Sequence, residues 1–245
     1  MLNFSIRGHN AWAPGIAGTA QWRAWVAAPF VPSCPAATPD LAFLPPLQRR
    51  RLGPLARMAV GCAWPLAEAE LPMPVVYASQ QGETSRGLAL LQTLARDEPL
   101  SPASFSLSVH NAIAGMWSIL RKETTESVAV SAVGDSLECG LTEACLLLNT
   151  GHQNVMVIVA AEAPPACYEP WIQDVPFSYA VALHLTPGTD FQVSKVASGG
   201  RQKAPPAAAP WPHALNLVRH LVSGTPAWEH RAGASGHWRW EQRTC

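Results

Sequence analysis

The pattern of hydrophobic and polar positions is clearest in the middle of the chain. Residues 127–133 alternate small or polar residues with valine, which is typical of a β-strand. Residues 137–148 carry apolar side chains at helical intervals, and Asp135 and Ser136 stand just before them, where helix N-caps are expected. Residues 155–161 are entirely apolar and predict a buried strand. Together these segments predict a βαβ unit with a glycine turn after its first strand.

Similar patterns recur on both sides of this unit. Strands followed by helices indicate α/β layering, and we expect a mixed five-stranded sheet flanked by helices, with residues 127–133 as its edge strand. An open edge strand without charged residues is a liability unless a partner covers it. Further strands are predicted at 3–7, 74–79 and 179–185, and helices at 20–27, 48–63, 85–94 and 105–120.

The character of the sequence changes beyond Pro187. Residues 201–212 are rich in alanine and proline and predict an extended linker, and residues 213–222 predict a short amphipathic helix. Trp238 and Trp240 alternate with charged residues, which favours an edge strand with one buried face. The predicted organisation is a main domain at 1–190, a linker at 191–212 and a C-terminal helix and edge-strand tail at 213–245.

The composition narrows the function classes. Only 14% of the 245 residues are charged, against roughly 25% in typical soluble domains, so we expect the chain either to bury much of its surface internally or to hide a face against a partner. Its 17 basic and 17 acidic residues give no field that would attract nucleic acid. We expect no secretory signal and no stable membrane insertion, because no apolar run is long enough. The six cysteines form no C-x-x-C pair, which favours a reduced, cytoplasmic compartment.

One short motif suggests hydrolase chemistry. Residues 134–137 read Gly-Asp-Ser-Leu, the motif of the GDSL esterases, in which Ser136 would be the nucleophile. That family supplies its base from a D-x-x-H pair, and the chain contains no such pair. Asp135 and Ser136 are sufficiently explained as helix caps.

Other candidates for chemistry are weaker. Cys139 and Cys145 lie inside the predicted helix rather than at its N-terminus, so buried, inert thiols are the default interpretation. His110, beside Asn111, is interpreted as a packed, hydrogen-bonded residue. The spacing of histidine, cysteine and aspartate suggests no metal site, and no glycine-rich loop suggests a nucleotide, so we expect no cofactor.

The central segment resembles a known family. Residues 131–134, Ser-Ala-Val-Gly, stand at the strand-to-helix turn, and the helix ends in Gly-His-Gln-Asn at 151–154. This order is similar to the β-ketoacyl synthases of the thiolase superfamily, whose S-x-x-C turn carries the acyl-accepting cysteine. Gly134 occupies that position. Residues 105–115 resemble the interface helix of the family. The resemblance covers roughly 3–186, and the tail beyond it has no evident counterpart.

The resemblance implies a thiolase-like half that lacks the second half with its two catalytic histidines and lysine. It therefore implies no catalytic residue but a chain-length factor, the silent partner of an active ketosynthase in aryl-polyene or type II polyketide pathways, with transient contact to an acyl carrier protein. The alternatives are a serine hydrolase using Ser136 and a purely structural interaction protein. Implied tunnel residues are Ser104, Phe105, Ser108, Val109, Asn111 and Ala112, with Phe105 equally expected in the core. Implied interface residues are Val128, Val130, Ala132 and Trp117.

Overall fold

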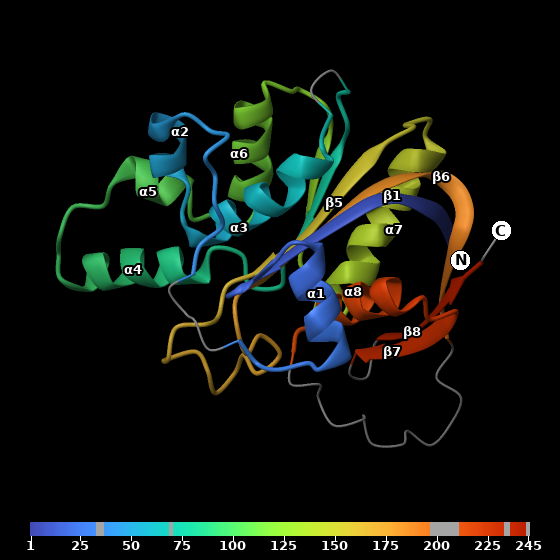
Figure 1. Cartoon of the computed structure of the whole chain (residues 1–245). Helices are drawn as coiled ribbons and strands as arrows, with labels where there is room; N and C mark the ends of the chain where they lie inside the picture. Colours follow the sequence, from blue (N-terminus) through green and yellow to red (C-terminus); the bar gives the residue numbers. More distant parts are fainter. Residues whose placement is uncertain (33–36, 69–70, 197–210, 233–235, 244–245) are drawn as a thin grey trace.

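A mixed β-sheet with helices on both faces forms the centre of the molecule (Figure 1). The computed structural model describes residues 1–32, 37–68, 71–196, 211–232 and 236–243. Its strands are β1 (Leu2–Ala13), β2 (Ile16–Ala17), β3 (Val75–Ala78), β4 (Ser127–Val130), β5 (Val155–Ala161), β6 (Tyr179–Lys195), β7 (Ala227–Ala232) and β8 (Gly236–Gln242). Its helices are α1 (Thr19–Ala27), α2 (Pro46–Arg51), α3 (Pro54–Ala63), the 3₁₀ turn η1 (Trp64–Leu66), α4 (Thr84–Ala95), α5 (Pro102–Ser106), α6 (Ala112–Arg121), α7 (Ser136–Asn149) and α8 (His213–Ser223).

The strand order explains why the sheet is mixed. The order is β2-β1-β6-β5-β3-β4; β3 pairs in parallel with β4 and β5, whereas β6 is antiparallel to β1 and β5. The five strands β1, β6, β5, β3 and β4 form the predicted mixed sheet. The sheet gains further strands from the two-residue β2 and from the hairpin β7–β8, which pairs with β6 through β8.

Two hydrophobic layers cover the two faces of the sheet. The side chains of β3 and β5 alternate, so that Tyr77 and Ile158 face α3 and α6, while Val76 and Val157 face α7. β5 is buried on both faces, as its unbroken apolar sequence predicts. A Cβ atom at Gly140 would lie 3.1 Å from the Ala78 side chain, so glycine permits the close approach of α7 to β3.

Two predicted helices are each divided in the structure. Residues 48–63 form α2 and α3, because Leu52 is extended and Pro54 begins a new helix at its first position. Residues 105–120 form the end of α5, a turn and α6. The hydroxyls of Ser106 and Ser108 donate to the carbonyls of Pro102 and Phe105, which competes with a continuous helix. None of the helices in the described ranges has the length and apolar character needed to cross a membrane.

The C-terminal residues share the core of the main domain. β6 continues to Lys195, so the predicted domain boundary at residue 190 lies inside a strand. Leu215 of α8 and Trp240 of β8 are fully buried in the same cluster as α1 and α7. Trp238 and Trp240 face the core as predicted, but β8 lies between β6 and β7 and is not an edge strand. Most of the predicted linker, residues 197–210, lies outside the described residues.

Candidate functional site

The turn between β4 and α7 is built around Gly134. Its φ of 82° lies in the left-handed region, which glycine adopts without strain. The Gly134 N–H donates to Gln80 Oε1 at 3.3 Å, and the Gly134 carbonyl accepts from His230 Nε2 at 2.9 Å. The Ser131 hydroxyl donates to the Gln80 carbonyl at 3.0 Å. The turn is therefore held between the loop after β3 and the C-terminal hairpin, and its apex carries no reactive side chain.

The residues that open α7 differ from simple helix caps. Asp135 takes the N-cap position, but its side chain makes no capping hydrogen bond and instead accepts from Trp238 Nε1 at 3.2 Å. The Ser136 hydroxyl donates to the Ala132 carbonyl at 2.7 Å. Within the described ranges no histidine is hydrogen-bonded to Ser136, so the serine hydrolase reading is not favoured: its nucleophile lacks a base.

The two cysteines of α7 are poor nucleophiles. Burial, with Asp135 as the next cause, raises the pKa of the Cys139 thiol to about 11. Burial alone raises the pKa of Cys145 to about 11 as well. Because the thiolate is the reactive form, both thiols are inert near neutral pH.

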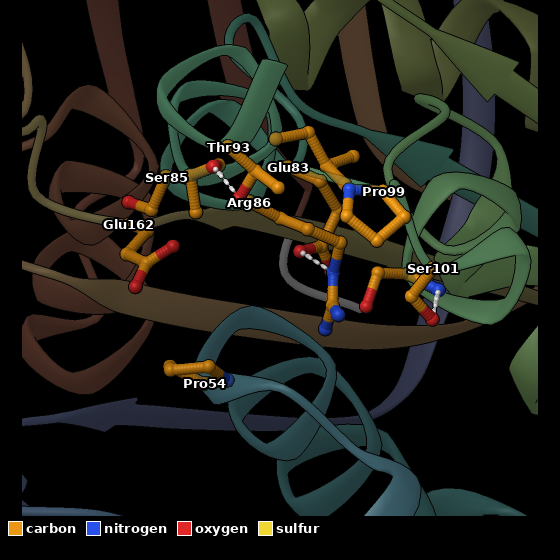
Figure 2. Close-up of a pocket in the computed structure, with 11 residues that line it drawn as sticks. Pro54, Glu83, Ser85, Arg86, Thr93, Pro99, Ser101 and Glu162 are labelled. Atoms are coloured by element: carbon orange, nitrogen blue, oxygen red, sulfur yellow. Dashed lines mark hydrogen bonds and ion pairs between the residues drawn. The ribbon is translucent and has the colours of Figure 1, made fainter. Parts of the chain in front are cut away.

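A pocket of about 530 Å³ that holds several charged side chains lies between α4 and α5 (Figure 2). Arg86 Nε contacts Glu83 Oε2 at 3.2 Å inside it. Burial raises the pKa of Glu83, and Arg86 opposes this effect. Burial also raises the pKa of Glu162, which lines the same pocket. Ser104, one of the six predicted tunnel residues, lines this pocket, which offers a guanidinium and two desolvated carboxyls to a ligand.

The other predicted tunnel residues follow Ser104 along α5 and the turn before α6. Phe105 is 60% exposed, so the expectation that it packs in the core is wrong. Val109 and Asn111 are also exposed, whereas Ser108 and Ala112 are half-buried. His110 between them is packed and hydrogen-bonded as predicted. Its Nε2 lies 2.6 Å from the Ser79 carbonyl, and its ring lies 5.7 Å from that of Tyr77.

β4 offers one open side. In the described part of the chain β3 is its only strand neighbour. The carbonyls of Glu126 and Val130 accept from the N–H groups of Val75 and Ser79, both at 3.0 Å. Because backbone groups alternate along a strand, those of the intervening odd residues, such as Ala129, point away from β3.

The predicted interface residues divide into two groups. Val128 and Val130 are half-buried against the α7 side of the sheet, and Ala132 is half-buried in the following turn. Val133, beside Ala132, is 75% exposed. Trp117 was predicted to lie at the dimer interface, but it is only 2% exposed and packs edge-to-face on Trp64 in the core. An aromatic residue on the inner side of an amphipathic helix contributes to the core rather than to an interface.

The sequence profile described as β-ketoacyl synthase, N-terminal domain, matches residues 22–241. The chain belongs to the β-ketoacyl synthase family. The match includes most of the C-terminal hairpin, so the expectation that the tail of this ketosynthase-family chain has no counterpart is wrong. No curated protein matches the sequence.

Solved structures share the fold of this ketosynthase-family chain. One chain of the complex of the ketosynthase ApeO with its chain length factor ApeC from Xenorhabdus doucetiae is 31% identical, with a TM-score of 0.87. The match covers 99% of this chain and 100% of that one. The ishigamide ketosynthase/chain length factor is 16% identical with a TM-score of 0.62, and a β-ketoacyl synthase from Burkholderia phymatum STM815 is 15% identical with a TM-score of 0.59. These two matches cover 79% and 84% of this chain and 67% of each relative. The predicted thiolase-like α/β fold is confirmed.

Proposed function

We propose that the chain is a chain-length-factor-type subunit that is catalytically silent by itself. It pairs with an active β-ketoacyl synthase and shapes or stabilises the acyl tunnel of that partner in polyene, polyketide or fatty-acid-type biosynthesis. The observation that carries the proposal is Gly134 at the apex of the strand-to-helix turn, where the resemblance to ketosynthases puts the acyl-accepting cysteine. A glycine has no side chain that could form a thioester.

The similarity to a chain of the ApeO–ApeC complex supports the same assignment. That match extends over nearly the whole of both chains, so the short length of this chain has a precedent in an assembly of a ketosynthase with its chain length factor. A silent subunit has to act through its partner, and transient contact with an acyl carrier protein in the cytoplasm would deliver the substrate to the active subunit.

The open side of β4 is the proposed contact with the ketosynthase. An uncharged edge strand whose outward-facing backbone groups have no strand partner in the described ranges favours pairing with another strand, and we place the equivalent strand of the partner there, antiparallel to β4. The low fraction of charged residues, 14%, fits a chain that covers part of its surface in this way.

Residues 104–112 are the proposed end of the partner's acyl tunnel. The segment projects Phe105 and Val109 outward and keeps the small side chain of Ser108 half-buried between them. Small residues there leave room for a long acyl chain, and a larger residue would close space that a well-packed site cannot recover.

The experiment reconstitutes the chain with its ketosynthase and a loaded acyl carrier protein and compares product masses. Ser108→Phe should shorten the products while the heterodimer stays intact. Ser223→Phe is the matched control, because Ser223 is exposed at the end of α8, and it should leave the products unchanged. Cys139→Ala should also change nothing. Unchanged products from an assembled Ser108→Phe complex would refute the measuring role, and failure of the wild-type chain to bind any ketosynthase would refute the pairing.

A further inference from the structure

Three ionisable side chains meet beside the Gly134 turn although they are far apart in the sequence. Glu138 lies in the first turn of α7, His213 begins α8, and His230 lies on β7. One nitrogen or oxygen atom from each of the three lies within 4.8 Å of the other two. The sequence spacing gave no sign of this cluster, because α8 and the hairpin have to fold back onto α7 before it exists.

The carboxylate of Glu138 is fully buried, at 0% exposure. Its Oε1 accepts from His213 Nε2 at 2.8 Å and from Trp240 Nε1 at 3.1 Å. Its Oε2 is buried and makes no hydrogen bond within the described residues, and the same holds for Nδ1 of His213. A buried carboxylate oxygen without a partner is costly, so the cluster keeps one buried acceptor that no described residue satisfies.

The two imidazoles lie face to face. Their ring centroids are 3.1 Å apart and their planes differ by 11°. Besides the bond between His213 and Glu138, His230 Nε2 is bonded to the Gly134 carbonyl. An ion that binds both rings would replace these two hydrogen bonds with metal–ligand bonds, and one ring has to turn about its Cβ–Cγ bond so that both nitrogen lone pairs converge.

We propose that Glu138, His213 and His230 bind one divalent transition-metal ion of the zinc class. Two imidazole nitrogens and one carboxylate oxygen are a donor set that Zn²⁺ prefers, with a water molecule completing the four ligands. The ion would satisfy the free Oε2 of Glu138. It would also join α7, α8 and β7, and thereby fasten the C-terminal residues to the turn that carries Gly134.

Metal binding is measured on the full-length chain, in complex with its ketosynthase if that keeps it soluble, after removal of metal with a chelator. Titration with ZnCl₂ in a calorimeter and with CoCl₂ by visible absorption should give one ion per chain and a tetrahedral Co²⁺ spectrum. Zn²⁺ should raise the melting temperature of the wild-type chain, because an ion that binds only the folded state stabilises it.

Variants separate this site from adventitious binding. His230→Ala and Glu138→Gln should each weaken Zn²⁺ binding at least tenfold and abolish the rise in melting temperature. Glu138→Gln retains the size and the acceptor for Trp240, so it remains informative if His230→Ala folds poorly. His237→Ala is the matched control: His237 lies on the same hairpin and pairs with Glu229 at the surface. The proposal would be overturned if all these variants bound Zn²⁺ with the affinity of the wild-type chain, or if the wild-type chain bound no ion. The cluster would then be only a set of hydrogen bonds that joins α7, α8 and β7.

Discussion

Replacement of Ala129 by proline tests the proposed contact through β4. The backbone N–H of Ala129 points away from β3, since the neighbouring carbonyls of Glu126 and Val130 are the ones that bind β3. Proline therefore removes a donor only from the open side of the strand. Edge strands are also among the few places in a sheet where proline is tolerated.

The expected loss of affinity follows from the hydrogen bond that proline removes. The missing N–H costs about 0.5–1.5 kcal/mol of net stabilisation, and the partner's carbonyl, left buried without a donor, costs about 1–3 kcal/mol more. A total of roughly 1.5–4.5 kcal/mol corresponds to binding that is about 10- to 2,000-fold weaker.

The assay compares the affinity of the co-expressed ketosynthase for wild-type, Ala129→Pro and Ala129→Ser chains by sedimentation velocity. Ala129→Ser keeps the N–H and is close to alanine in size, so it should bind within a fewfold of wild type. The melting temperature of each chain is measured alongside, because a proline that unfolds β4 would weaken binding for another reason.

A folded Ala129→Pro chain that binds the ketosynthase as tightly as wild type would refute pairing through β4. Equal weakening by Ala129→Ser would refute it too, since the backbone donor would then not be the cause.

The structure supports two further predictions. Because the pKa of Cys139 is about 11 rather than the ordinary 9.0, iodoacetamide near pH 8 should modify it about 100-fold more slowly than a thiol with the ordinary value. Exposed Cys167 serves as the internal reference. The rate should rise about tenfold per pH unit until that pKa; fast modification at neutral pH, or an acyl adduct on Cys139 in intact-mass spectra, would contradict the inert interpretation. Leu215→Ala, on the buried face of α8, should lower the free energy of unfolding by about 2–5 kcal/mol in urea, whereas exposed Ser223→Ala should have little effect. A near-neutral Leu215→Ala would mean that the C-terminal residues are not part of the cooperative fold.

The elements that were predicted best from the sequence are those whose pattern of apolar residues depends on burial alone. β5 spans the predicted residues 155–161, and α7 begins one residue before and ends one residue after the predicted 137–148. These elements lie in the middle of the molecule, where each apolar side chain faces a packed layer, so their periodicity is strong.

Other elements were predicted less well for identifiable reasons. β1 extends to Ala13, beyond the predicted 3–7, and its pairing with β6 shifts register between Phe4 and Ser5 and between Ile6 and Gly8. Such irregularities interrupt the simple alternation that marks a strand. The helix breaks near Pro54 and Ser106 arise from local backbone chemistry that apolar spacing does not record.

The contacts around Gly134 could not have been predicted from sequence spacing. His230 bonds to the Gly134 carbonyl across 96 positions in the sequence, and Trp238 to Asp135 across 103. No local pattern specifies contacts of this range, and they form only after β8 pairs with β6.

These long-range contacts satisfy polar groups at the start of α7. His230 is hydrogen-bonded to the carbonyl of Gly134. The indole N–H groups of Trp238 and Trp240 donate to the carboxylates of Asp135 and Glu138, respectively. The C-terminal residues thus take up polar groups at the start of α7 that would otherwise be buried without partners. They do so on the α7 side of the sheet, while the outer side of β4 stays open. In the proposed heterodimer, the chain therefore completes its own core around the Gly134 turn and leaves β4 for the ketosynthase.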